Sequence, residues 1–165
     1  MISGCVQNDS NTQESTHDSR IDDIKLSESD ILSFRGDPID SSLSSHPLDN
    51  YNLNVYRYKW TSENSDDTTD LQIEVYEYKD EDALNTEFNK RVDGKKDSYQ
   101  MSPKYFLELT ENVGVGEKSI LTGTTLSSSH EIEFIKENFL ILIHGDSEIE
   151  RSEILDLARI IEAKI

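Results

Sequence analysis

The chain has a single cysteine, few basic residues and no long apolar run. Because Cys5 is the only cysteine among 165 residues, an intrachain disulfide is excluded. The longest apolar run, residues 139–143, is far shorter than the ~20 residues that a membrane-spanning helix needs. Only 16 lysines and arginines oppose 34 aspartates and glutamates, which gives a net charge of −18. So acidic a surface repels phosphate backbones and anionic headgroups, which argues against a nucleic-acid partner and against a basic membrane-binding patch.

The sequence also lacks the motifs of common catalytic and cofactor sites. No serine lies in a Gly-x-Ser-x-Gly turn, and Gly114-Val115-Gly116 lacks the third glycine of a dinucleotide-binding loop. The four histidines have no spacing typical of zinc ligands (His17, His46, His130 and His144). We therefore expect a protein that is not an enzyme and that has neither a metal nor a cofactor.

Two acidic segments leave weak cation binding open as an alternative. Residues 64–70 (NSDDTTD) superficially suggest a calcium loop. An EF-hand needs glycine at its sixth position and glutamate at its twelfth, where this chain has Thr69 and Val75. Residues 144–150 (HGDSEIE) are more typical of an acid-rich helix N-terminus than of a metal site.

The first five residues carry the motif that bears most directly on location. Ile2-Ser3-Gly4-Cys5 places an aliphatic residue and two small residues before the only cysteine. This order resembles the lipobox of prokaryotic lipoproteins, in which the cysteine is lipidated and becomes the mature N-terminus. The resemblance implies that Cys5 is the lipidation site. Four residues cannot supply the charged and apolar regions of a signal peptide, so we expect the native gene to encode one upstream of Met1.

Residues 1–20 are expected to be the lipobox remnant and a disordered tether. Residues 6–20 (VQNDSNTQESTHDSR) contain one aliphatic residue, so they cannot bury enough apolar surface to offset the entropy lost on ordering. A flexible segment of about 20 residues spans roughly 25 Å, which is enough to hold a domain clear of a bilayer. Residues 21–165 are long enough for a single domain with one core.

Segments of alternating apolar and polar residues and one short apolar run, separated by turn residues, predict the strands of this domain. The expected strands are residues 53–60, 70–79, 105–110, 118–124, 130–136 and 139–144. A hairpin loop at residues 61–69 joins the first two, and the turn Glu137-Asn138 joins the last two, where the asparagine suits a left-handed conformation. Residues 35–50 contain two prolines, a glycine and a serine run, which predict a loop.

Two helices are predicted between and after the strands. Asp80 suits the N-cap of a mid-chain helix that we expect to end at Gly94. A final helix is expected after Gly145, capped by Asp146 or Ser147. Its apolar residues fall at helical spacing on one face: Ile154, Leu157, Ala158, Ile161 and Ile165. The order predicts an α+β fold, an antiparallel sheet of about five to six strands with the mid-chain helix and the C-terminal amphipathic helix packed on one sheet face, in two or three layers.

The C-terminal third resembles a known pattern. The segments NVGVGEKSILTG, HEIEFIKENFLILIHGD and SEILDLARIIEAKI are similar to the C-terminal part of uncharacterised archaeal and bacterial lipoproteins. The match covers residues 112–165 and, more loosely, residues 75–92. The order of elements also looks like the PsbP-type fold and like certain extracellular sensor domains. The matching residues lie in turns and at core positions, so the resemblance implies a fold and no catalytic residue.

Five aromatic residues form the best candidate for a binding surface: Tyr56, Tyr58, Trp60, Tyr76 and Tyr78. Aromatic residues that alternate on adjacent strands most often pack across the strands beneath a helix. The alternative is an apolar groove with polar phenol tips, suited to a peptide, a glycan or a lipid.

These observations predict a lipoprotein anchored to the extracytoplasmic face of the cell membrane through its lipid. Its domain is expected to be a non-enzymatic binding or accessory module for a protein or small-molecule ligand. The alternative is a sensor or solute-binding component of a transporter or receptor complex. A hydrolase with an unrecognised site is a third and weaker interpretation.

Overall fold

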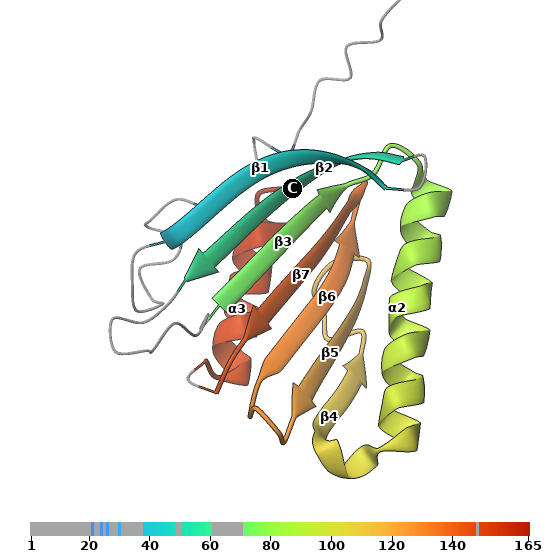
Figure 1. The fold of residues 1–165 in the computed structure, drawn as a ribbon, viewed down its shortest axis with the longest axis vertical. Coiled ribbons are helices and arrows are strands. Elements are labelled where there is room, and N and C mark those ends of the chain that lie inside the picture. The colour runs from blue at the N-terminus through green and yellow to red at the C-terminus, as the bar shows by residue number, and fades with distance from the viewer. Residues whose placement is uncertain are drawn as a thin grey trace, which may run out of the picture.

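The computed structural model describes four residues near the N-terminus and four longer segments (Figure 1). They are Ile21, Ile24, Leu26 and Asp30, with residues 38–48, 51–60, 71–147 and 149–165. For residues 38–48, 51–54 and 60 only the backbone is described. Cys5 and the expected tether lie outside the described residues, as do the predicted hairpin loop and the segment that suggested a calcium site.

The domain is built on one antiparallel sheet of seven strands in the order β1-β2-β3-β7-β6-β5-β4. The strands are β1 (Pro38–Leu48), β2 (Tyr51–Trp60), β3 (Leu71–Glu77), β4 (Phe106–Glu111), β5 (Lys118–Thr124), β6 (His130–Lys136) and β7 (Phe139–Gly145). Helix α2 (Glu81–Met101) follows β3, the 3-10 helix η2 (Pro103–Tyr105) leads into β4, and α3 (Arg151–Glu162) follows β7. The predicted α+β fold class, with a mid-chain and a C-terminal helix on an antiparallel sheet, is confirmed.

Strand β1 corrects the prediction of a loop at residues 35–50. It pairs with β2 over its length, from Pro38 opposite Trp60 to Leu48 opposite Tyr51. Proline cannot donate a backbone hydrogen bond, but an edge strand pairs on one side only and tolerates it. Pro38 is the first residue of the strand and Pro47 lies one residue from its end. The prolines and serines are therefore compatible with an edge strand, although the same residues argue against an interior strand.

Helix α2 begins as predicted and ends later. Asp80 is the N-cap, and its side chain accepts a hydrogen bond from the backbone N–H of Asp82 at 3.0 Å. The expected stop at Gly94 is wrong, because the helix continues to Met101. A glycine in a helix interior costs only about 1 kcal/mol relative to alanine, which neighbouring contacts can offset. The helix ends instead just before Pro103.

The final helix starts later than the sequence suggested. Its N-cap is Glu150 and not Asp146 or Ser147, and Glu150 forms a reciprocal capping box with Glu153. The carboxylate of Glu153 accepts from the backbone N–H of Glu150 at 2.7 Å. The predicted apolar stripe is confirmed in its central part, where Ile154, Leu157, Ala158 and Ile161 are all buried.

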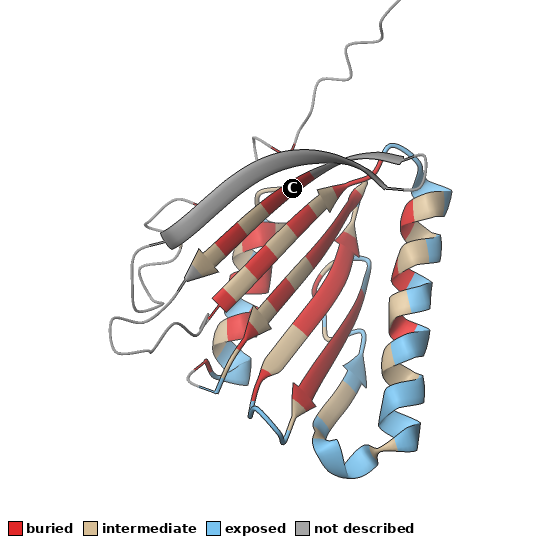
Figure 2. Cartoon of the chain, in the orientation of Figure 1, coloured by how far each residue is buried: buried red, intermediate tan, exposed pale blue. Residues whose placement is uncertain are grey.

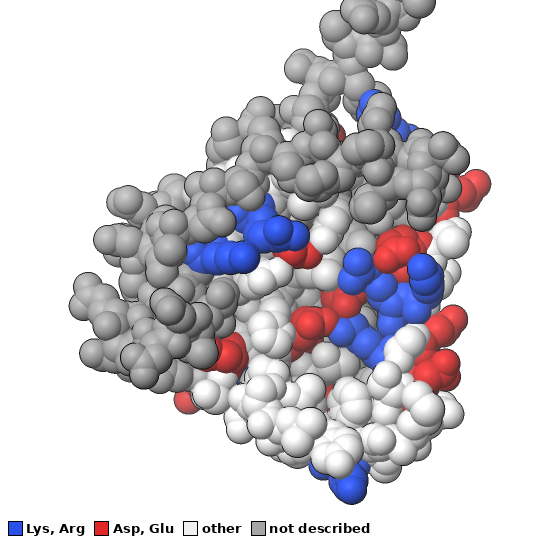
Figure 3. Space-filling view, viewed as in Figure 1, with Lys and Arg blue, Asp and Glu red and all other residues white. Residues whose placement is uncertain are grey.

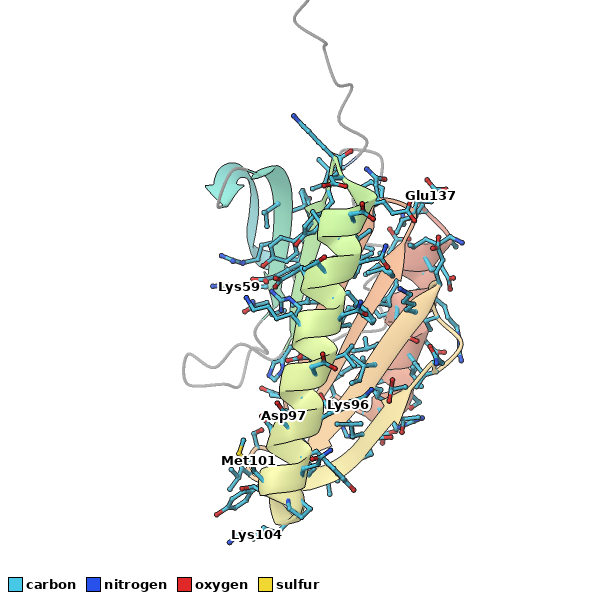
Figure 4. All side chains as sticks on the ribbon, turned by 90° about the vertical axis from the view of Figure 1, so that its right-hand side faces the viewer. Lys59, Lys96, Asp97, Met101, Lys104 and Glu137 are labelled. Atoms are coloured by element: carbon cyan, nitrogen blue, oxygen red, sulfur yellow. The ribbon has the colours of Figure 1, made fainter. Side chains whose placement is uncertain are left out.

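The two helices lie on opposite faces of the sheet, so the prediction that both cover one face is wrong. Helix α3 lies behind the sheet in Figure 1, and in the turned view of Figure 4 helix α2 lies in front of the sheet with α3 on its far side. Neighbouring residues of one strand serve the two faces: Phe134 packs in the cluster under α3, and Ile135 packs in the cluster under α2. A sheet covered on both faces needs apolar residues at successive positions, as in the run Phe139 to Ile143. The domain is therefore a three-layer sandwich with buried central strands (Figure 2).

The β6–β7 turn is formed by the two predicted residues. Lys136 pairs with Phe139, which leaves Glu137 and Asn138 between the strands. The left-handed conformation falls on Glu137, with φ 51°, and not on Asn138. Asn138 is held by Tyr78, whose backbone oxygen accepts from the Asn138 side-chain amide at 3.2 Å. Among the described helices, none is long and apolar enough to cross a membrane.

Candidate functional site

The space between α2 and the sheet divides into an apolar half and a polar half. In the apolar half, Leu84, Phe88 and Val92 from α2 pack on Ile135 and Leu140 of the central strands. Closer to the C-terminal end of α2, the side of the helix that faces the sheet becomes polar. There Arg91 and Lys95 form ion pairs with Glu133 of the sheet. The polar half is the candidate functional site.

The sheet register brings the polar residues of five strands into line. One lateral row joins residues paired across the sheet: Lys59, Gln72, His144, Glu131 and Thr122. The next row joins Arg57, Glu74, Leu142, Glu133 and Ile120. Because side chains alternate between faces, both rows project toward α2. Residues that are more than 50 positions apart in the chain thus share one surface, and Figure 3 shows the resulting band of mixed charges beside α2.

A cavity of about 340 Å³ lies in the polar half, between α2 and strands β5, β6 and β7. The helix contributes Arg91, Gly94, Lys95 and Ser98, the sheet contributes Thr122, Thr124, Glu131, Glu133 and His144, and Phe106 and Ser129 complete the lining. A smaller cavity of about 170 Å³ adjoins it, and Glu131 and His144 line both. The two cavities together follow the polar row across the sheet.

Lys95 is the centre of the ion-pair network in this site. Its Nζ lies 3.0 Å from Glu133 Oε1 and also donates a hydrogen bond to Glu131. On the other side of Glu131, Oε2 lies 3.5 Å from His144 Nδ1. Arg91 pairs with Glu87 at 2.8 Å, and its Nη1 lies 3.8 Å from Glu133 Oε2. Each of the two cations is therefore matched by carboxylates.

The pKa values of buried Glu133 and half-buried Glu131 are shifted in opposite directions. Burial raises the pKa of Glu133 above its ordinary value, and Lys95 only partly opposes that effect. Burial also acts to raise the pKa of Glu131, but the hydrogen bond from His144 and the charge of Lys95 outweigh it, so this pKa falls below its ordinary value. Burial acts to lower the pKa of Lys95, and its two carboxylate partners raise it instead. Lys95 therefore stays charged, and Glu131 is its main counter-ion.

Glu133 keeps one unsatisfied oxygen. Its side chain is 3% exposed, and Oε2 has no hydrogen-bond partner among the residues that the structure describes. A buried polar atom without a partner costs roughly 1–3 kcal/mol. The residue lines the cavity. A molecule in the cavity with a hydrogen-bond donor would remove this cost.

A second cluster on the same face surrounds Glu74. Its Oε1 accepts from Arg57 Nε at 2.7 Å and from Gln72 Nε2 at 2.8 Å, and its Oε2 accepts from the hydroxyl of Tyr76. Burial raises the pKa of Tyr76 well above its ordinary value, and the bond to Glu74 adds to that effect. Three donors hold this carboxylate in place, so it serves as a fixed wall of the smaller cavity.

Gly94 is the one residue of the cavity lining that has no side chain. It lies in the interior of α2, and a Cβ built on it would meet nothing within 4 Å. Neither a close contact with the sheet nor a left-handed backbone therefore requires glycine here. Its effect is to leave the cavity open on the helix side.

The predicted aromatic residues do not gather on one surface. Tyr56 and Tyr58 lie on the α3 face, buried with their rings 4.4 Å apart, and the Tyr58 hydroxyl donates to the backbone oxygen of Leu26 at 3.0 Å. Tyr76 and Tyr78 lie on the α2 face, where Tyr78 is part of the apolar cluster and Tyr76 packs at its margin. The side chain of Trp60 and the predicted lipidation site, Cys5, lie outside what the structure describes.

Of the residues that line the polar cavity, the sequence pointed only to His144, as a weak cation ligand, and did not connect it with the others. Arg91, Lys95 and Ser98 recur at helical spacing, which indicates one polar stripe on α2. Glu131 and Glu133 alternate with apolar residues in β6, a pattern that is also typical of a strand with one face in solvent. Local sequence patterns did not indicate that α2 lies over this face of the sheet. Because α2 covers it, the polar stripe on β6 becomes a wall of a cavity.

Comparison with protein-family models, with curated proteins and with solved structures found no match. The resemblance to prokaryotic lipoproteins and to PsbP-type domains stays a prediction. Within residues 71–147 and 149–165 and the other described positions, no group of three or more His, Cys, Asp or Glu side chains could hold a metal ion.

Proposed function

We propose that the protein is a lipoprotein of the extracytoplasmic membrane face whose domain binds a small polar ligand in the cavity between α2 and the sheet. The lipobox-like sequence ending at Cys5 and the polar composition of residues 6–20 support the anchor. The cavity supports the binding role, because about 340 Å³ is within the range of small-molecule sites, roughly 300–1,000 Å³.

Gly94 is the observation on which the binding proposal rests. An interior glycine destabilises a helix by about 1 kcal/mol relative to alanine. No protein atom lies where its Cβ would be, so packing gives no compensating benefit. Gly94 is exposed at the rim of the cavity, and the absence of its side chain leaves open volume at the mouth. A binding site retains such volume, whereas a purely structural interface would fill it.

The state of the charged groups favours binding over catalysis. Lys95 engages both carboxylates of the cavity, and Arg91 engages Glu87 and Glu133. A general base needs a carboxylate or imidazole that is free to accept a proton from a substrate. In this site the groups neutralise and orient one another, which suits recognition without bond cleavage.

A sensor or solute-binding component of a membrane complex is the second candidate. Five large apolar residues of the described chain are more than a third exposed, and they lie near the C-terminal end of α2 and the start of β4: Tyr99, Met101, Tyr105, Leu107 and Leu126. The backbone N–H of Thr125 donates to the Tyr105 oxygen at 2.9 Å, which joins the two segments that carry them. Residues 98–107 and 122–129 contain no acidic residue. Such a surface beside a ligand cavity suits a partner protein.

Two substitutions at Gly94 test the binding proposal on the full chain. A ligand-observed NMR screen of small polar metabolites should identify at least one compound that binds the parent protein. Gly94→Ala should keep the affinity within about twofold and raise the free energy of unfolding by about 1 kcal/mol. Gly94→Leu should lower the affinity at least tenfold while the protein stays folded, because its side chain occupies the cavity. Binding that survives in Gly94→Leu would contradict the assignment of the site.

A further inference from the structure

We infer that the ligand of this cavity is a neutral, hydroxyl-rich molecule of the size of a mono- or disaccharide. The inference rests on the proposed function, since it names the ligand class of the same site. Its basis is the pairing of the charges in the cavity wall, the hydrogen-bonding groups that remain, and the aromatic ring at one end.

Both cations of the wall are paired with carboxylates before any ligand arrives. Arg91 and Lys95 face Glu131 and Glu133, two positive groups against two carboxylates, and Glu87 gives Arg91 a further partner. His144, which is 45% exposed at its side chain, adds its Nδ1 to Glu131. A phosphate or a carboxylate would have to displace Glu131 or Glu133 from Lys95, and an amine would have to displace Lys95. A neutral ligand leaves every pair intact.

The hydrogen-bonding groups that remain call for a partner that both donates and accepts. Glu133 Oε2 is buried and has no hydrogen-bond partner among the described residues, since Arg91 Nη1 lies 3.8 Å away, so it can accept from a donor. The hydroxyls of Thr122, Thr124 and Ser129 lie along the wall formed by β5 and the β5–β6 turn, and a hydroxyl both donates and accepts. The hydroxyls of Thr124 and Ser129 share a hydrogen bond of 3.1 Å, and a hydroxyl in such a pair keeps a lone pair that can accept from a ligand. A ligand with several hydroxyl groups matches this set.

Phe106 gives the cavity an apolar surface. It is the first residue of β4, half-buried, and its ring packs edge-on against Tyr99 at 5.5 Å between centroids. A sugar ring has a polar rim of hydroxyls and faces of C–H groups, and the faces pack on aromatic rings. The volume of about 340 Å³ lies at the lower end of small-molecule sites, which suits one or two rings and excludes a long chain.

The test uses the purified full chain and a panel of defined probes. Saturation-transfer NMR would test whether the protein binds each of six sugars: glucose, galactose, mannose, N-acetylglucosamine, maltose and lactose. Glycine, inorganic phosphate and putrescine would serve as zwitterionic, anionic and cationic comparisons. At least one sugar should bind, and the three charged probes should not.

Two matched variants assign that binding to the wall of the cavity. Thr122→Val removes one hydroxyl at nearly constant volume and should weaken sugar binding about three- to tenfold, the effect of one hydrogen bond. Thr110→Val makes the same change on the exposed side of β4, outside the cavity lining, and should leave the affinity unchanged. Gly94→Leu should abolish sugar binding.

The outcomes separate the ligand class from the proposed function. Binding of a charged probe that is lost in Gly94→Leu, without sugar binding, would overturn the ligand class and leave the site in place. No binding by any sugar would also overturn the class. Sugar binding that is unchanged in both Thr122→Val and Gly94→Leu would overturn the class and the site together.

Discussion

Replacing Lys95 by methionine is expected to destabilise the domain by about 2–4 kcal/mol at pH 7. Methionine keeps the length of the stem and removes the charge. Glu133, which is 3% exposed, and Glu131, which is 29% exposed, would then lose their shared cation. Removing one partner from a buried ion pair typically costs about 3–5 kcal/mol. The lower range applies here because Lys95 is 19% exposed and because Arg91 and His144 stay near the carboxylates.

Lys96→Met is the matched control on the same helix (Figure 4). Lys96 lies 2.9 Å from Glu111, but the side chains of this pair are 36% and 46% exposed. Ion pairs in water contribute roughly 0–1 kcal/mol, so the control should change stability by no more than about 1 kcal/mol. The two variants remove the same charge from neighbouring residues and differ in the burial of the partner.

The loss in Lys95→Met should depend on pH with a defined sign. Burial already raises the pKa of Glu133 in the folded state, and without Lys95 less positive charge opposes that effect, so this pKa rises further above its value in the unfolded chain. A raised folded pKa means that the folded state gains relative stability as the pH falls and loses it as the pH rises through that pKa. The deficit of Lys95→Met should thus be largest near pH 7 and shrink below about pH 5.

Urea unfolding at pH 7 and pH 4.5, followed by circular dichroism, measures these differences as shifts of the midpoint at constant slope. Equal losses in Lys95→Met and Lys96→Met would refute the reasoning, because burial of the carboxylates would then have no effect. A deficit that stays constant between the two pH values would also refute it.

Three further predictions follow from the fold, the site and the sequence. Leu157→Ala should lower stability by roughly 2–5 kcal/mol, because Leu157 is fully buried under the sheet, whereas exposed Asp156→Ala should change it by no more than about 0.5 kcal/mol in the same urea titration. Glu131→Gln should make stability depend less on pH in the acid range. The lowered pKa of Glu131 contributes stability at pH values above the ordinary pKa of 4.5, and this contribution is lost as the pH falls. Protein expressed from the full native gene should fractionate with membranes and be released by detergent and not by salt, and Cys5→Ser should make it soluble; unchanged fractionation would contradict the lipobox interpretation.

The elements that the sequence predicted well are those in which one periodicity acts alone. The alternation in residues 130–136 located β6, the apolar run 139–143 located β7, and the stripe around Leu157 located α3. The errors arose where two signals compete. The prolines of edge strand β1 resemble those of a loop. Gly94 resembles the end of a helix, although α2 continues to Met101.

The candidate site depends on information that local patterns do not hold. Glu131 lies beside His144 because β6 pairs with β7, and His144 lies beside Gln72 because β7 pairs with β3. The pairing partner of β7 on its outer side comes from about 70 residues earlier in the chain. The sequence suggested a polar stripe on α2 and a polar stripe on β6, but only the assignment of the helix to that face brings the two together.

The pairing of β3 with β7 has a consequence for how the domain assembles. Strands β4, β5, β6 and β7 form a meander in which every strand pairs with its neighbour in the chain. The pairing of Leu71 with Gly145 instead joins residues that are 74 positions apart in the chain. Long-range closure of this kind slows folding, since chain entropy is lost before the contact repays it. The smaller cavity, with Gln72 and Glu74 on one side and Leu142 and His144 on the other, straddles this junction. A molecule bound across this junction would contact both strands, and it would therefore slow the separation of β3 from β7 during unfolding.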